Sequence, residues 1–169
     1  MKYVFKPYEA IYKELFLKEK GRLGKVLGEK IQIEHVGSTA VPGLGGKGII
    51  DIAISAKRDS FKSTSKLLES LGYEFKPNAG VKKRLFFLRK VNDKKGKVRT
   101  YHIHLTNFVG SEWKRLLKFR DYLLTHPKAV VGYAKVKKAA AKNSNQDKDI
   151  YMKIKEPKIK NILEKALKI

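Results

Sequence analysis

The chain has 169 residues, no cysteine and a formal net charge of +23, from 39 Lys and Arg against 16 Asp and Glu. This length and a hydrophobic content of 42% fit one soluble domain with its own core. The lack of cysteine excludes disulfides and thiolate metal sites, and no apolar run approaches the roughly 20 residues that span a bilayer. No signal-peptide pattern opens the chain, so we expect a cytoplasmic protein without a membrane partner.

The excess of basic residues is spread along the whole sequence, and lysines far outnumber arginines. A positive field of this kind attracts nucleic acid or phosphorylated ligands. A lysine bias of the source proteome explains the same composition equally well. Nucleic acid is therefore one candidate partner, and the composition gives no indication of the oligomeric state.

An amphipathic helix is predicted over residues 8–27. Pro7 suits the first turn of a helix and Gly28 its end. Between them apolar side chains recur at helical spacing, namely Tyr8, Ile11, Tyr12, Leu15, Phe16, Leu23, Val26 and Leu27. We expect this apolar stripe to pack into the core.

Two strands with a glycine-rich loop between them follow the helix. Residues 32–36 alternate between apolar and polar, and residues 49–54 form a continuous β-branched run that is typical of a buried strand. Asp51 is the one charged residue inside the second strand. A carboxylate in a buried strand is costly unless it meets a partner, so Asp51 is the first candidate for a functional residue.

The loop between these strands has the composition of a phosphate site. Glycines let the backbone approach an anion closely, and their N–H groups can form an anion-binding nest. Ser38 adds a hydroxyl donor, Lys47 adds a mobile positive charge, and Asp51 can hold a divalent cation against the phosphates. The alternative is a plain glycine-rich turn in which local N–H groups cap Asp51.

The middle of the chain predicts a helix and three strands. The helix begins at Asp59 or Ser60 and ends at Gly72. A short strand at 73–75 follows, and then strands at 84–91 and 98–107, which a polar loop joins into a hairpin.

His102 and His104 lie two residues apart on the last of these strands, so both side chains project from one face of the sheet. This spacing suits a pair of metal ligands and equally a phosphate-binding pair. The alternative is a polar, half-exposed sheet face without a ligand.

The rest of the sequence is helical. Ser111 is the predicted cap of a helix that ends before Pro127, and a second helix covers residues 130–142. A last helical region begins at Ile150 and is predicted to be interrupted by Pro157.

The first part of the chain resembles the signature of the GrpB family, which is assigned to the polymerase-β-like nucleotidyltransferase superfamily. The matching residues are His35-Val36-Gly37-Ser38-Thr39-Ala40-Val41-Pro42-Gly43-Leu44, Lys47 and Ile49-Ile50-Asp51-Ile52. The superfamily pattern is Gly-Ser, a loop, and then Asp-hydrophobic-acid-hydrophobic on the next strand. Ala53 departs from it, because it stands where active superfamily enzymes carry a second metal-binding acid.

Later segments extend the resemblance from about Tyr8 to Ala166. They are Arg84-Leu85-Phe86-Phe87, His102-Ile103-His104, Phe119-Arg120-Asp121-Tyr122-Leu123 with His126-Pro127, Tyr133 to Lys137, and Tyr151 with Lys155. The resemblance implies an α/β fold of the α+β type, in which helices flank a nucleotidyltransferase-like mixed sheet. It implies a single domain over residues 1–169, with a mixed α/β core at 1–107 and a C-terminal helical portion at 111–169.

The resemblance also implies a function. The chain would bind a nucleotide or another phosphorylated small molecule through its phosphates and transfer a nucleotidyl group to an acceptor. Asp51, His102 and His104 are the expected catalytic residues and the expected ligands of one divalent ion, Mg²⁺ or Zn²⁺. The expected phosphate-binding residues are Gly37, Ser38, Lys47 and Arg84.

Ala53 argues against two-metal catalysis, because two cations need more carboxylates than this strand supplies. The competing interpretations are a catalytically silent module that binds a nucleotide or phosphometabolite, and a basic RNA-associating protein.

Overall fold

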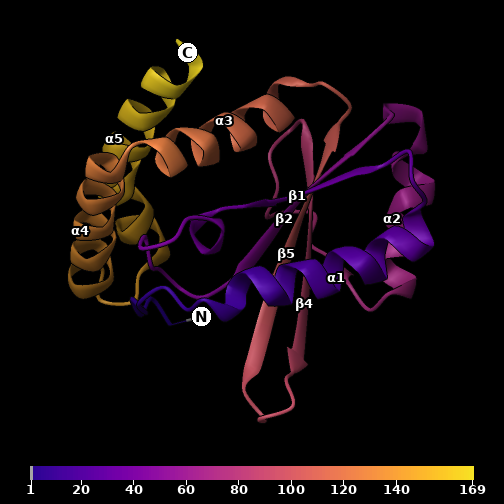
Figure 1. The fold of residues 1–169 in the computed structure, drawn as a ribbon, viewed down its shortest axis with the longest axis horizontal. Helices are drawn as coiled ribbons and strands as arrows, with labels where there is room; N and C mark the ends of the chain where they lie inside the picture. The colour runs from indigo at the N-terminus through magenta and orange to yellow at the C-terminus, as the bar shows by residue number, and fades with distance from the viewer. Residues whose placement is uncertain (1) are drawn as a thin grey trace.

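The computed structural model describes residues 2–169 and folds them into a five-stranded sheet flanked by helices (Figure 1). In chain order the elements are α1 (Ile11–Leu27), β1 (Gln32–Val36), the 3-10 helix η1 (Ser38–Ala40), β2 (Ile50–Ala56), the 3-10 helix η2 (Arg58–Ser60), α2 (Phe61–Ser70), β3 (Glu74–Phe75), β4 (Arg84–Asn92), β5 (Val98–Asn107), α3 (Ser111–Thr125), α4 (Pro127–Asn143) and α5 (Lys148–Leu167). Figure 1 shows α3, α4 and α5 gathered at the left, away from α2. The predicted mixed sheet with flanking helices and a helical C-terminal portion is confirmed.

The strand order is β1-β2-β5-β4-β3, with β2 and β5 parallel and every other neighbouring pair antiparallel. The register places Asp51 opposite His102 on β5 and Ala53 opposite His104. Cross-strand partners project from the same face of a sheet. The register alone therefore brings the three candidate catalytic residues onto one face, at the centre of the sheet.

The opposite face of the sheet forms the main core with α1 and α2. Ile50, Ile52 and Ile54 project there from β2 and are fully buried. They pack with Leu23 of α1 and Leu68 of α2, both also fully buried. Each such side chain contributes about 1.5–3 kcal/mol by leaving water. This core fixes β2, and with it Asp51 on the other side of the strand.

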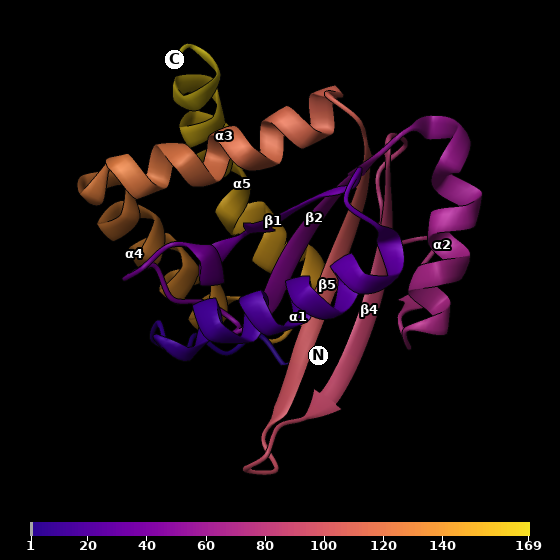
Figure 2. The ribbon, with the colours of Figure 1, turned by 45° about the vertical axis from the view of Figure 1, so that its right-hand side comes forward.

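The predicted β4–β5 hairpin is confirmed, and Figure 2 shows that its tip extends beyond the rest of the molecule. Asp93 shapes the turn, because its Oδ1 accepts hydrogen bonds from the backbone N–H groups of Lys95 and Lys97 at 2.9 Å. Its Oδ2 accepts another from Nε of Arg99 at 2.9 Å. Within residues 2–169 no helix is both long and apolar enough to cross a membrane.

Several of the predicted helix starts are wrong by a few residues, and α4 and α5 begin at Pro127 and Lys148 instead of at residues 130 and 150. The first helix begins at Ile11 and not at residue 8, because Lys6 pairs its backbone with Gly46 and holds the preceding segment extended. Ser111 is the first residue of α3 and gives no side-chain cap, and Gly110 occupies the cap position.

The predicted interruption at Pro157 is also wrong, since α5 runs unbroken from Lys148 to Leu167 with the proline inside it. Buried residues on both sides of the proline, Tyr151 before it and Ile162 after it, anchor the helix against the rest of the protein. This packing outweighs the hydrogen bond that the proline removes. Pro127 likewise does more than end α3, because it is the first residue of α4.

Candidate functional site

The site is built around Asp51, whose side chain keeps 23% of its area exposed. Nε2 of His104 donates a hydrogen bond to Oδ1 of Asp51 at 2.9 Å, and Nδ1 of His102 lies 3.6 Å from the same oxygen. Burial raises the pKa of Asp51, but the two imidazoles outweigh burial and hold the pKa well below its usual range. Asp51 is therefore a charged acceptor oriented by its neighbours on β5.

Phe86 of β4 fixes the two histidine rings from the side. Its ring centroid lies 4.7 Å from that of His102 and 5.5 Å from that of His104, both in edge-on contact. Within residues 2–169, Nε2 of His102 and Nδ1 of His104 are buried and have no hydrogen-bond partner. Each histidine thus turns one nitrogen toward Asp51 and keeps the other away from water.

Gly37 lets the turn after β1 lie directly against the carboxylate. It has φ 73° and ψ −170°, a conformation that is essentially restricted to glycine. A Cβ atom at this position would stand 2.6 Å from Oδ2 of Asp51. The glycine of the predicted Gly37-Ser38 pair is therefore required twice, by its backbone angles and by the space that Asp51 occupies.

The short helix η1, which begins at Ser38, is pinned from the opposite side of the sheet. The ring of His35 stacks on Phe16 of α1, and its Nε2 lies 3.0 Å from Oγ1 of Thr39. That hydroxyl donates to the carbonyl of Ile49 at 2.8 Å. Burial lowers the pKa of His35 to about 4, so at neutral pH it is an uncharged structural residue.

The sequence suggested that the backbone N–H groups of the glycine loop are open to an anion, but at least two of them are not. The N–H of Gly46 donates to the carbonyl of Lys6 at 2.9 Å, and the N–H of Leu44 donates to that of Val41 at 3.2 Å. Those donors are already used inside the protein. At Leu44 and Gly46 an anion would therefore have to be bound by neighbouring groups and not by these two N–H groups.

Lys47 and Arg84, both predicted to bind phosphate, have different surroundings. The ammonium group of Lys47 lies 5.1 Å from the centroid of the Tyr3 ring and 5.5 Å from that of Tyr151. Burial lowers the pKa of Lys47, whereas the negative charge of Asp51 raises it, so the two side chains interact electrostatically. Arg84 forms an ion pair with Glu112 of α3 at 3.3 Å. Its charge is thus partly balanced before any ligand arrives.

Two buried lysines of the helical portion belong to the site and were not among the predicted site residues. Lys137 of α4 is 5% exposed, and its Nζ donates a hydrogen bond to the carbonyl of Gly45 at 2.7 Å. Lys155 of α5 is 9% exposed, and its Nζ lies 4.4 Å from the centroid of the Tyr151 ring. The helical portion therefore contributes two ammonium groups to the glycine loop and its surroundings.

These lysines are electrostatically strained. Burial lowers the pKa of Lys137 to about 7 and that of Lys155 to about 8, and repulsion from neighbouring lysines adds to the effect. Asp51 acts in the opposite direction on both. Among residues 2–169, no Asp or Glu forms an ion pair with either ammonium group. Near neutral pH the site therefore holds two buried amines that a bound anion would keep protonated.

The sequence does carry a signal for these lysines. Tyr133 and Lys137, and likewise Tyr151 and Lys155, are spaced four residues apart, which places each pair on one helix face. Nζ of Lys137 lies 5.3 Å from the centroid of the Tyr133 ring, and the second pair has the matching contact. A tyrosine four residues before a lysine is thus the pattern that separates these two from the many solvated lysines.

Gly46 of the glycine loop lies beside both the ammonium group of Lys137 and the hydroxyl of Ser38. A Cβ atom at Gly46, which has φ 155°, would stand 2.5 Å from Nζ of Lys137 and 2.7 Å from Oγ of Ser38. The Lys137 ammonium and the Ser38 hydroxyl are thus close to the same point beside the loop. Two donors of this kind suit a phosphate oxygen.

The donor set does not fit a two-metal centre. Ala53 stands at the position of the second acid, is fully buried, and packs with Val36 and Trp113. Within residues 2–169, no group of three or more His, Cys, Asp or Glu side chains has the arrangement to hold a metal ion. The expectation of one ion at Asp51, His102 and His104 stays a prediction.

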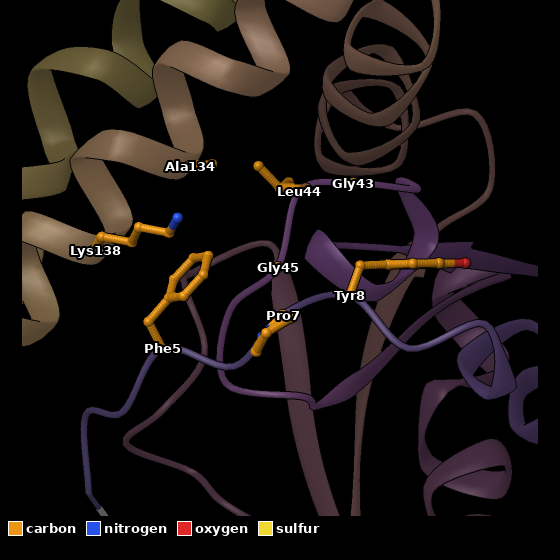
Figure 3. A pocket seen from close by; sticks show the side chains of 8 residues that line it. All are labelled: Phe5, Pro7, Tyr8, Gly43, Leu44, Gly45, Ala134 and Lys138. Atoms are coloured by element: carbon orange, nitrogen blue, oxygen red, sulfur yellow. The ribbon is translucent and has the colours of Figure 1, made fainter.

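A cavity of about 510 Å³ adjoins the site at Gly45 (Figure 3). Figure 3 shows Phe5 and Lys138 side by side at one wall, and Nζ of Lys138 lies 5.1 Å from the centroid of the Phe5 ring. The cavity offers aromatic and apolar surface next to the lysine-lined part of the loop.

Comparisons with known proteins identify the family. The sequence profile described as GrpB protein matches residues 3–165. The UPF0157 protein YqkA of Bacillus subtilis is 35% identical over 94% of this chain and 46% of its own length, and the UPF0157 protein PA4798 of Pseudomonas aeruginosa is 38% identical over 80% and 55%. This chain therefore spans about half the length of these two relatives.

A solved structure agrees with this assignment over the whole chain. The crystal structure of conserved protein GrpB from Enterococcus faecalis superimposes with a TM-score of 0.82, at 30% identity and 98% coverage of both chains. The fold and the sequence thus give the same answer. The chain belongs to the GrpB family.

Proposed function

We propose that this chain binds a nucleotide through its phosphates, on the sheet face where Asp51 meets the glycine loop and helices α4 and α5. The observation that carries the proposal is the convergence of the Ser38 hydroxyl and the Lys137 ammonium at Gly46. Lys155 and Lys47 add positive charge around the same Tyr151 ring. The aromatic cavity beside Gly45 offers a surface for a base.

Nucleotidyl transfer to an acceptor is the reaction that the family resemblance implies for such a site. Asp51 would orient the acceptor hydroxyl by accepting its hydrogen bond, because His104 holds this carboxylate in its charged form. The acceptor oxygen would bond to the α-phosphorus as pyrophosphate leaves, and the hydroxyl proton would pass to water. Lysine charges would stabilise the negative charge that develops on the phosphate. With Ala53 in place of a second acid, we expect transfer to be slow with a generic acceptor. The alternative is a module that keeps the pocket and binds without reacting.

The first prediction concerns Ser38. In the wild type, a bound nucleoside triphosphate at about 100 times its Kd adds about 2.7 kcal/mol to the free energy of unfolding, or roughly 5–10 °C in Tm. Ser38→Ala removes one hydroxyl donor to the phosphates, so we expect Kd to rise about fivefold to tenfold. A thermal-shift screen of the four nucleoside triphosphates with Mg²⁺, followed by calorimetry, measures both effects.

Ser63→Ala is the matched control, because the Ser63 hydroxyl is exposed and bonds only within its own helical turn. This variant should bind as the wild type does. If none of the four nucleotides shifts Tm while a small phosphorylated metabolite does, the nucleotide assignment is wrong and the phosphate assignment stands.

RNA association is the second candidate function, and a separate cavity of about 250 Å³ favours it. Tyr122 and His126 stack at its wall with ring centroids 3.8 Å apart. Lys128, Lys158 and Lys165 surround them. Aromatic rings among lysines are a usual arrangement for single-stranded nucleic acid, since bases stack and ammonium groups meet phosphates.

The second prediction tests this cavity lined by Tyr122, His126 and lysines as a binding site for an RNA oligonucleotide of mixed sequence. Each phosphate that a lysine neutralises adds about 0.7 to the slope of log K against log salt for a single strand. Lys158→Gln should weaken RNA binding and lower this slope by about that amount, as measured by fluorescence anisotropy at several salt concentrations. Lys153→Gln, on an exposed face of the same helix, serves as the control. Equal slopes for both variants would show that RNA does not bind at this cavity.

A further inference from the structure

The charges around Asp51 are the reverse of those in a metal-dependent phosphate site. Such a site gathers carboxylates, so that cations are held and then bind the phosphates. Here Asp51 is the one carboxylate of the predicted site, and Oδ1 already accepts the hydrogen bond from His104. Ala53, two residues further along β2, is fully buried in a cluster with Trp113 and supplies no ligand atom.

Ammonium groups lie around the glycine loop, close enough to Asp51 for its charge to raise the pKa of both Lys137 and Lys155. Lys137 reaches the glycine loop at Gly45 and Gly46, and Lys155 shares the Tyr151 ring with Lys47. Lys137 and Lys155 are more than nine-tenths buried, and no carboxylate within residues 2–169 forms an ion pair with either of them. A buried charge is retained only at a considerable cost, so these two are explained best by an anionic partner that the chain lacks on its own.

The same charges act on a metal ion in the opposite sense. A divalent cation beside Asp51 would be repelled by each of these ammonium groups, whereas a phosphate chain would be attracted by all of them. The N–H groups of Leu44 and Gly46 are already bonded inside the protein, so these two do not bind the anion.

We infer that Lys137 and Lys155 hold the phosphate chain of the ligand directly, in place of a divalent metal ion. The inference rests on the proposed function and makes it more specific. The ligand class is a free polyphosphate ester, such as a nucleoside triphosphate without bound magnesium. Asp51 is then left to the acceptor and has no part in binding the phosphates.

The experiment measures the Kd of ATP and of inorganic triphosphate by calorimetry, once in EDTA and once with excess Mg²⁺. We expect both probes to bind in EDTA at least as tightly as with Mg²⁺. Lys137→Met and Lys155→Met should each raise Kd in EDTA at least about tenfold, since each removes a charge-assisted contact. Lys135→Met and Lys153→Met, exposed on the same two helices, should change Kd less than about twofold.

Asp51→Asn separates the two mechanisms. A carboxylate that holds a metal against the phosphates would be essential, and its loss would abolish binding. A carboxylate that only stands near the anion repels it, but it also helps to keep both lysines protonated. These two effects oppose each other, so we expect Asp51→Asn to retain binding in EDTA. Circular dichroism and Tm of each variant show whether it is folded.

The outcomes distinguish the inference from the proposed function. Binding that requires Mg²⁺, or binding in EDTA that the two buried lysines do not affect, overturns the inference and leaves the proposed function standing. Binding of inorganic triphosphate but not of ATP overturns the nucleotide assignment and leaves the lysine site standing. If neither probe binds in either buffer, both are wrong.

Discussion

Replacing Lys137 with methionine is expected to raise the free energy of unfolding at pH 7 by roughly 2–4 kcal/mol. Burial lowers the pKa of Lys137 from 10.5 to about 7, and each pKa unit corresponds to about 1.4 kcal/mol of unfavourable charge burial. Methionine has a similar length and no charge, so it removes this cost. Part of the gain is lost again, because the carbonyl of Gly45 loses its hydrogen bond, worth about 1 kcal/mol.

The pH dependence gives this prediction a second measurement. The pKa of Lys137 is lower in the folded chain than in the unfolded chain, so between about pH 7 and pH 10 the unfolded chain binds more protons. Stability of the wild type therefore rises with pH across this window, and Lys155 adds to the rise above about pH 8. Burial raises the pKa of Tyr12 to about 12, and tyrosines of this kind favour the unfolded chain above pH 10.

Urea unfolding followed by the fluorescence of Trp113 measures both effects. Lys137→Met should be more stable than the wild type at pH 7, and its stability should rise less between pH 7 and pH 9.5. Lys135→Met, exposed on the same helix, should follow the wild type at every pH. A variant that is more stable and yet binds triphosphate poorly has lost a ligand contact, not its fold. A loss of stability at pH 7 would contradict the argument.

Local patterns were sufficient to predict most of the fold. Alternation and β-branched residues located β1, β2 and the β4–β5 hairpin, because β2 is buried along nearly its whole length and β5 alternates between buried and more exposed residues. The predicted interruption at Pro157 was wrong, since tertiary packing can stabilise a helix enough to keep it continuous through a proline. The packing that keeps α5 continuous involves distant residues, which local reasoning does not detect.

The site was predictable where its residues lie close together in sequence or in register. Gly37, Ser38 and Asp51 flank one loop, and His102 and His104 share one strand face. Lys137 and Lys155 lie far along the chain among many solvated lysines, and only the docking of α4 and α5 buries them. Arg84 shows the converse: its partner Glu112 on α3 balances a charge that seemed available to a ligand.

Gly37→Ala is expected to lower the free energy of unfolding by about 3–5 kcal/mol. The backbone conformation of Gly37 alone costs a residue with a side chain about 1–3 kcal/mol. The new methyl group would also stand 2.6 Å from Oδ2, 2.9 Å from Cβ and 3.0 Å from Cγ of Asp51, so β1 and β2 would have to shift apart. We expect the Asp51–His104 hydrogen bond to be displaced and ligand binding to weaken, because the phosphate-binding Ser38 directly follows Gly37 and moves with the turn.

Gly28→Ala is a closely matched control. Gly28 has nearly the same backbone conformation, with φ 85° and ψ 168°, but a Cβ atom there meets nothing within 4 Å. It should lose only the backbone part, about 1–3 kcal/mol, and bind normally. The double variant Gly37→Ala with Asp51→Ala should recover part of the loss, because Oδ2 and Cγ are gone, and a double-mutant cycle measures that coupling. Equal losses of unfolding free energy for Gly37→Ala and Gly28→Ala, with no coupling to Asp51, would mean that a side chain at position 37 does not clash with the Asp51 carboxylate.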